Sequence, residues 1–216
     1  MNKIIYIPNL SNQQFIEQYA KPGCIALVGG THFIDESIKK AQKKITTNGK
    51  QSLWSHAFIF SGLRQDGHIW LIESDLEFHK KQIKLGVQEN RAEKYFDKTL
   101  FPHIAILDFN LNQASQNKLI AQGLNLVAAK VQYSIREIFG VLYTMFNAKA
   151  SSNANILTQN NSFFCSAMVQ HCYAALNINF NNNITTKNIT PQHIYTTNQP
   201  CVIYTNVNID TILQKH

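Results

Sequence analysis

Apolar runs, alternating runs and helically spaced runs follow one another along the chain, and this succession is typical of a mixed α and β protein. Residues 23–30, GCIALVGG, are apolar and end in paired glycines, which predicts a buried strand. Residues 33–45 predict an amphipathic helix, because their apolar positions recur at roughly helical spacing. Those positions are Phe33 and Ile34, Ile38, Ala41 and Ile45.

A strictly alternating run and a following Asp-Gly turn predict a β-hairpin. The first strand lies in SHAFIFSG, residues 55–62, and its partner in HIWLIES, residues 68–74. Side chains two apart in a strand share a face, so one face of the first strand is expected to carry aromatic residues beside a histidine. The residues of this face are His56, Phe58 and Phe60.

The rest of the pattern completes an α+β fold. It predicts a strand at 103–110, helices at 114–131 and 135–146, a helix carrying Cys165, and a last strand at 201–207. This order indicates an antiparallel sheet packed against helices. The length of 216 residues suits one domain, and no repeat or boundary divides the chain, so residues 1–216 are expected to form a single domain.

Composition and charge narrow the classes of partner. The net charge of +7 is compatible with nucleic acid, anionic lipid or an acidic polymer such as cell wall, but the basic residues are scattered. The densest run, KKAQKK, is typical of the solvated face of a helix, and no nucleic-acid signature accompanies it. The N-terminus lacks the apolar core of a signal peptide, and no run is long enough to span a membrane. We therefore expect a protein without a transmembrane segment, either cytoplasmic or exported by a specialised route, and nucleic acid is not an expected partner.

The four cysteines show neither a disulfide framework nor a zinc pattern. Their spacing, without a CxxC pair, fits reduced thiols. Cys165 and Cys172 share a helix face, but His171 points elsewhere and no set of four ligands closes around them. No metal and no cofactor are therefore expected.

Cys165 occupies a position that suits a nucleophile as well as a core residue. If the helix is capped by Ser162, Cys165 falls in its first turn, where the helix dipole favours a thiolate and free N–H groups can stabilise an oxyanion. The spacing of Cys165, Val169, Cys172 and Leu176 also turns Cys165 inward. From this helix alone both interpretations stand, whereas Cys172, deeper in the helix, is expected only to pack.

A histidine and a carboxylate on the predicted hairpin supply the partners that a nucleophilic thiol needs. His56 is a candidate base, and Glu73 follows three large apolar residues, so its burial would require a partner such as an imidazole. The alternatives are a structural histidine and a glutamate that ends its strand at the surface. The sequence does not fix the hairpin register. Together with Cys165, the two residues describe a Cys-His-carboxylate triad.

Several motifs, in this order, resemble the YiiX-type permuted papain-like proteins, which are circularly permuted relatives of the NlpC-type cell-wall peptidases. The motifs are PGCIALVGG, WSHAFIFSG, WLIES, FFCSAMV and TPQHIY, and they span about residues 22–200. The lecithin:retinol acyltransferase group shares the permutation. The resemblance implies a circularly permuted papain-like (NlpC-like) fold, with the histidine strand before the cysteine helix and the nucleophile at a helix N-terminus.

The resemblance also implies roles for individual residues. Cys165 corresponds to the nucleophile, His56 to the general base and Glu73 to the group that orients the base. The acyltransferase group has a second histidine at the third position, for which His68 is a poorer match than Glu73 because it begins the second strand. Tyr133 resembles a tyrosine that precedes a helix in this family, which implies that Tyr133 helps to line the substrate site. One departure is Ala167, where relatives often have glutamate, and this alters the pocket without removing the triad.

The expected activity is that of a cysteine hydrolase that cleaves an amide bond through a thioester, in peptides or in peptidoglycan stem peptides. Without a signal peptide, action on cell wall would require specialised delivery, as for an antibacterial effector, and such an effector implies a cognate inhibitor protein. One alternative is a lipid-directed thioesterase or acyltransferase. It requires a membrane-docking segment, for which residues 135–146 are the one candidate, and their pattern favours a core helix instead. Another is a binding module that keeps the fold without catalysis.

Overall fold

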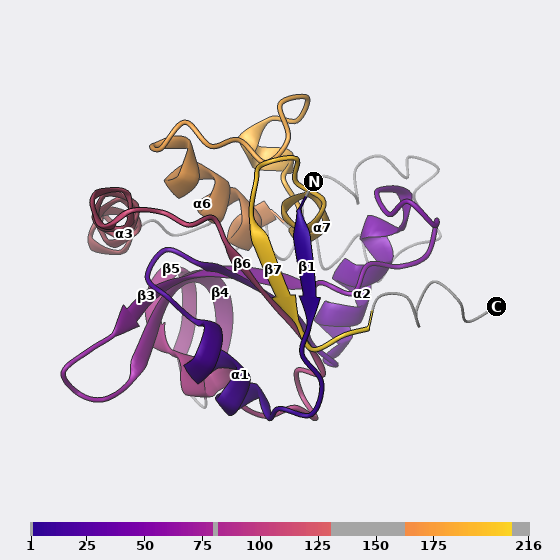
Figure 1. The fold of residues 1–216 in the computed structure, drawn as a ribbon, viewed down its shortest axis with the longest axis horizontal. Helices are drawn as coiled ribbons and strands as arrows, with labels where there is room; N and C mark the ends of the chain where they lie inside the picture. Colours follow the sequence, from indigo (N-terminus) through magenta and orange to yellow (C-terminus); the bar gives the residue numbers. More distant parts are fainter. Residues whose placement is uncertain (1, 80–81, 131–162, 209–216) are drawn as a thin grey trace.

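A seven-stranded sheet forms the centre of the computed structural model, which describes residues 2–79, 82–130 and 163–208 (Figure 1). The strand order is β1-β7-β6-β2-β3-β4-β5; β1 pairs with β7 in parallel, and every other neighbouring pair is antiparallel. The predicted α+β class is confirmed. The strands are β1 (Lys3–Tyr6), β2 (Ile25–Gly29), β3 (His56–Leu63), β4 (Ile69–His79), β5 (Gln82–Arg91), β6 (His103–Asp108) and β7 (Val202–Thr205).

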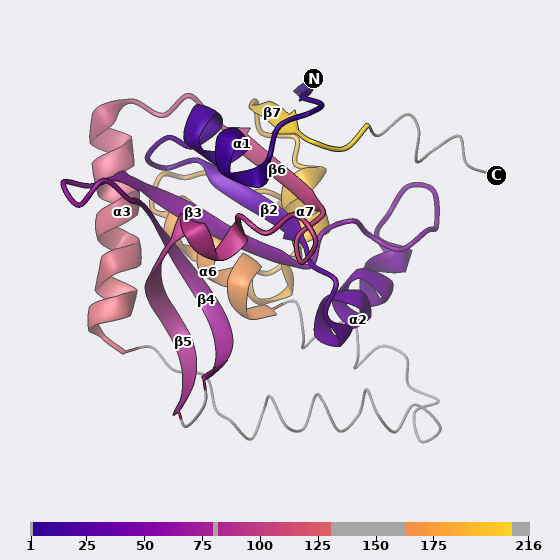
Figure 2. The same cartoon turned by 90° about the horizontal axis from the view of Figure 1, so that it is seen from below.

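Helices cover both faces of the sheet. Figures 1 and 2 show α1 on one side and α6 with α7 on the other. The α-helices are α1 (Asn12–Tyr19), α2 (Phe33–Ala41), α3 (Gln113–Ala128), α6 (Phe163–Ala174) and α7 (Pro191–Tyr195). The short 3-10 turns are η1 (Gln42–Lys44), η2 (Ala92–Tyr95) and η3 (Thr186–Asn188). Within the described ranges, no helix combines the length and the apolar character needed to cross a membrane. The helix predicted at 135–146 and the capping residue Ser162 lie outside the described residues.

Two hydrophobic cores, one on each face of the sheet, explain the apolar runs in the sequence. Alternate residues of β3 enter different cores: Ala57 and Ile59 pack on the face of α6, and Phe58 and Phe60 on the face of α1. The predicted alternation of β3 is thus confirmed as far as Phe60, where the pairing with β4 shifts register. Since β2 is buried along its whole length, it appears in the sequence as a continuous apolar run.

Helix α2 forms where it was predicted, but its apolar positions are exposed or only half-buried, and its most buried side chains are polar. Phe33 is 63% exposed, whereas Lys39 and Gln42 are buried. The reason is hydrogen bonding at the helix ends. Lys39 Nζ donates to the Gly30 carbonyl at 3.0 Å, and Gln42 Nε2 donates to the Trp54 carbonyl at 2.7 Å. Buried polar side chains with such partners hold the helix in place of an apolar stripe.

Strand β4 is longer than predicted, and its partner β5 was missed. The two pair from Trp70 and Arg91 to His79 and Gln82, whereas β3 pairs with β4 only from Leu63 to Phe58. Residues 75–91 contain many polar residues without clean alternation, so the periodicity that identified β3 was missing. A strand at a sheet edge accommodates such a sequence because it packs less completely.

Helix α6 is fixed so that its first turn lies at the beginning of β3. The helix packs against both β3 and β4. At its far end the Tyr173 hydroxyl donates to the Gly23 carbonyl beside β2. Gln170 holds the following segment, accepting from the Phe180 N–H at 2.9 Å and donating to the Ile178 carbonyl at 3.0 Å. These contacts set the depth at which the helix N-terminus meets the sheet.

We expect Gly29→Ala to destabilise the fold by about 3 kcal/mol, as overpacking of a rigid site does. A Cβ at Gly29 would lie 2.0 Å from the Leu53 carbonyl oxygen, which is backbone and cannot turn aside. Urea unfolding followed by circular dichroism measures the loss.

Gly49→Ala is the matched control for this change. A Cβ there would meet nothing within 4 Å, so only its positive φ of 66° opposes alanine, at about 1 kcal/mol. Equal losses in the two variants would contradict the steric explanation.

Candidate functional site

The hairpin register, which the sequence left open, brings His56 and Glu73 together. Phe58 lies directly opposite Glu73 in the β3–β4 ladder. His56 is two residues before Phe58 and therefore shares its face, diagonally across from Glu73. His56 Nε2 lies 2.7 Å from Glu73 Oε2, and the glutamate side chain is completely buried. A glutamate ending its strand at the surface is excluded, since Glu73 lies in the middle of β4 and not near its end as predicted.

Four side chains hold the buried carboxylate of Glu73. Asn90 Nδ2 and Lys94 Nζ donate to Oε1 at 2.6 and 2.7 Å, and the Tyr95 hydroxyl donates to Oε2 at 2.5 Å beside His56. Burial alone would raise the pKa of Glu73. The hydrogen bond to His56 and the charge of Lys94 outweigh burial and hold the pKa well below its usual range. Glu73 is therefore ionised behind the imidazole at neutral and mildly acidic pH.

Cys165 reaches the same imidazole from the other face of the sheet. It is the third residue of α6 and only 6% exposed. Burial favours the neutral thiol, but the charge and hydrogen bond of His56 act in the opposite direction, and the Ala57 N–H and the Ser166 hydroxyl assist them. The net effect lowers the pKa of Cys165. The first turn of a helix, where Cys165 lies, also favours a negative charge.

The contacts of His56 define what its two ring nitrogens can do. A carboxylate only accepts hydrogen bonds, so Nε2 carries the proton that Glu73 Oε2 accepts. In the neutral ring Nδ1 is then the acceptor, and it is the nitrogen left for the thiol of Cys165. The arrangement can remove a proton from the thiol and keep the resulting imidazolium next to an anion.

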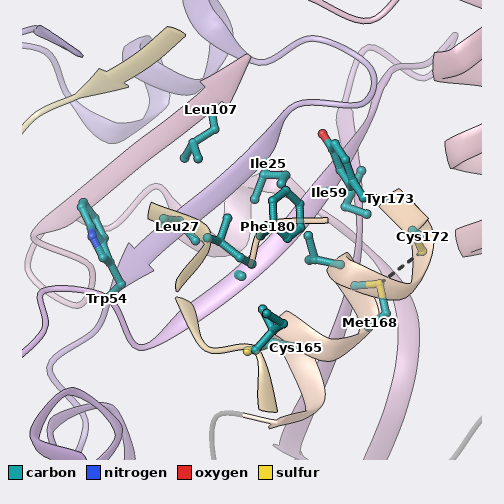
Figure 3. Close-up of a cluster of buried hydrophobic side chains, with 14 of the residues drawn as sticks. Ile25, Leu27, Trp54, Ile59, Leu107, Cys165, Met168, Cys172, Tyr173 and Phe180 are labelled. Carbon is teal, nitrogen blue, oxygen red and sulfur yellow. Dashed lines mark hydrogen bonds between the residues drawn. The ribbon is translucent and has the colours of Figure 1, made fainter. Parts of the chain in front are cut away.

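The other three cysteines lack this environment. Burial raises the pKa of Cys24 and Cys172 to about 12 and that of Cys201 to about 11, with Asp108 adding to the effect at Cys24 and Cys201. Figure 3 shows Cys172 further along α6, where its thiol contacts Met168 inside the core. Cys172 therefore packs, as predicted, and Cys165 alone among the four has a lowered pKa.

Other residues singled out in the sequence lie elsewhere. His68 pairs with Glu93 on the hairpin surface, away from the position that Glu73 fills. Ala167 follows two residues after Cys165 in α6. Tyr133 lies outside the described residues. In the portion of the chain with assigned positions, no group of three or more His, Cys, Asp or Glu side chains is placed to hold a metal ion.

The sequence analysis missed the residues that surround Glu73. Asn90 lies on the overlooked strand β5, and Lys94 and Tyr95 lie on the turn η2 that follows it. One signal was available: a carboxylate predicted to be buried requires more than one donor, and ENRAEKY, at the end of β5 and in η2, carries several polar residues. The contact of the Ala57 N–H with the Cys165 thiol could not be predicted from the sequence, because it depends on where β3 stops pairing with β4.

No family model and no curated protein matches the chain. Among solved structures, the chain is similar to the crystal structure of the metalloprotein YiiX from Escherichia coli O157:H7. The TM-score is 0.52 and the sequence identity 12%, and the match covers 85% of this chain and 96% of that chain. At this identity the similarity establishes a related fold alone. The expected resemblance to YiiX is confirmed at that level.

We expect Glu73→Gln to flatten the acid side of the stability profile. The folded-state pKa of Glu73 lies below the value of about 4.3 in an unfolded chain. Its ionised form therefore stabilises the fold above that value, and the stabilisation is lost as the pH falls toward the folded-state pKa. Between about pH 6 and about pH 3 the wild type should lose on the order of 2 kcal/mol more unfolding free energy than the variant, measured by urea titration.

Glu93→Gln serves as the control, because Glu93 forms only a surface pair with His68 and such pairs contribute little. Its pH profile should follow that of the wild type. Parallel profiles for wild type and Glu73→Gln would show that the buried carboxylate has no lowered pKa.

Proposed function

We propose that this chain is a cysteine hydrolase in which Cys165 is the nucleophile, His56 the general base and Glu73 the residue that orients His56. The observation that carries the proposal is the position of the His56 imidazole, which hydrogen-bonds the Cys165 thiol and a completely buried carboxylate. A nucleophile, a base and an orienting acceptor in series are the parts that thiol catalysis requires.

In the proposed reaction His56 Nδ1 takes the thiol proton, and the thiolate attacks an amide carbonyl. The imidazolium then gives its proton to the leaving amine, and a thioester remains on Cys165. Water, activated by the same imidazole, releases the acid and restores the thiol. Glu73 stays ionised throughout and keeps the proton of the neutral ring on Nε2.

Chain order supports assignment to the permuted papain-like type. The histidine strand β3 precedes the cysteine helix α6, and the helix N-terminus meets the sheet where the histidine begins its strand. The fold-level similarity to YiiX agrees with the motifs that suggested this family.

The proposed reaction uses no metal, although YiiX is described as a metalloprotein. The carboxylate that partners His56 is already saturated: each oxygen of Glu73 accepts two hydrogen bonds, and one of the four comes from the cation Lys94. An ammonium at 2.7 Å is a poor neighbour for a second cation. These donors fit a base-orienting carboxylate better than a metal ligand.

The proposed substrates are peptide amide bonds, including those of peptidoglycan stem peptides. The net charge of +7 favours an anionic polymer over a neutral one. Delivery to cell wall as an antibacterial effector, with a cognate inhibitor protein, is the corresponding biological setting.

Iodoacetamide should alkylate Cys165 rapidly at about pH 6, because its lowered pKa preserves thiolate where an ordinary thiol, with a pKa of about 8.5, is protonated. His56→Gln should slow this alkylation at least about 10-fold, since the cation that stabilises the thiolate is lost. Mass spectrometry of the labelled peptide measures both rates. A pH dependence like that of free cysteine would indicate a binding module instead of an enzyme.

The purified protein should release amine groups from muropeptides or from unmodified peptides. Cys165→Ala and His56→Ala should each reduce the rate at least about 1000-fold, because the members of such a triad act as a unit. Cys172→Ala is the matched control and should retain activity. A wild type inactive on both substrate classes would refute the amide-hydrolase proposal.

A further inference from the structure

Ser74 places a buried hydroxyl without a partner in the described residues on the face of the sheet that also carries the proposed nucleophile. It follows Glu73 in β4 and so faces the opposite side of the sheet, the side of α6. The residue is 3% exposed, and its Oγ has no hydrogen-bond partner in the described structure. A buried hydroxyl left unpaired costs free energy, so such a group calls for an explanation.

Ser74 lies at the end of the ladder between β4 and β3, and β3 carries two contacts of the Cys165 thiol, His56 and Ala57. The β3–β4 ladder ends at the pair of Phe58 and Glu73, and Ala57 and Ser74 are the next residues along the two strands, both on the face of α6. The N–H of Ala57 contacts the Cys165 thiol. On the other side Ser74 is opposite Val87, which belongs to the same buried cluster as Ala57 and Cys165. Ser74 thus lies where β3 and β4 stop pairing, on the face of the sheet against which α6 packs.

We propose that the Ser74 hydroxyl donates a hydrogen bond to the oxyanion of the tetrahedral intermediate formed at Cys165; this inference rests on the proposed hydrolase function. As the bond from sulfur to the carbonyl carbon forms, the π electron pair moves to oxygen, and Ser74 stabilises that charge without transferring its proton. When the intermediate collapses, the carbonyl re-forms, the bond to the leaving group breaks, and the imidazolium protonates that group. A donor that acts only on the oxyanion raises the rate of this step.

Two other serine hydroxyls, those of Ser166 and Ser61, can be compared with the hydroxyl of Ser74. Ser166 follows Cys165 directly, and its Oγ lies 3.8 Å from Sγ, so it bonds the thiol itself. Ser61 is the closest analogue of Ser74: its Oγ is also buried without a partner in the described residues. It lies beyond Phe60, at the far end of β3 from His56, and therefore provides a matched control.

Two reactions of Cys165 separate oxyanion stabilisation from a structural role. Acylation by p-nitrophenyl acetate passes through a tetrahedral oxyanion, whereas alkylation by iodoacetamide does not. Ser74→Ala should slow the acylation burst about 100-fold and leave the alkylation rate unchanged. Ser74→Thr, which keeps the hydroxyl, should recover most of the acylation rate, and Ser61→Ala should match the wild type in both reactions.

Each other outcome overturns the inference. An unchanged acylation rate in Ser74→Ala would show that the hydroxyl does not bond the oxyanion, and equal slowing of both reactions would show a structural role. Absence of Cys165-dependent acylation in the wild type would refute the proposed hydrolase as well, so the two failures are distinguishable.

Discussion

The burial of one negative charge, the carboxylate of Glu73, is the constraint on which the site depends. An isolated carboxylate in a protein interior costs several kcal/mol, so its surroundings must supply donors and positive charge. β3, β5 and η2 each contribute to this shell, through His56, Asn90, Lys94 and Tyr95. The sheet edge and the following turn are therefore organised around one side chain, and the imidazole is one of four groups that satisfy it.

The site also depends on a contact between side chains from opposite faces of the sheet, which is possible at the end of a strand. His56 shares the face of Phe58 and Phe60, while Cys165 belongs to the core on the opposite face. In the middle of a sheet the backbone would separate such residues. They meet because His56 is the first residue of β3 and the ladder with β4 starts two residues later, at Phe58.

Much of this arrangement could be predicted from the sequence, and the physical reasons for the failures are specific. Alternation identified β3, and the burial cost of a glutamate after three apolar residues pointed to an imidazole partner. Periodicity failed for β5, whose edge position tolerates polar residues. It located α2 but not the buried side chains of that helix, because Lys39 is buried through a hydrogen bond to a backbone carbonyl. The register that joins His56 to Glu73 depends on how β3 and β4 pair, and so does the position of Ser74 relative to β3. Neither can be predicted from the sequence of one strand alone.

Successive side chains of a β-strand point to opposite faces of the sheet. The register of β3 therefore decides whether His56 can contact both Glu73 and the Cys165 thiol. A slip of β3 by one residue would move His56 to the face of Ala57 and leave Glu73 buried without its imidazole. A reactive Cys165 would thus report on two contacts at once, the pairing of β3 with β4 and the packing of α6, from a distant part of the sequence, against β3.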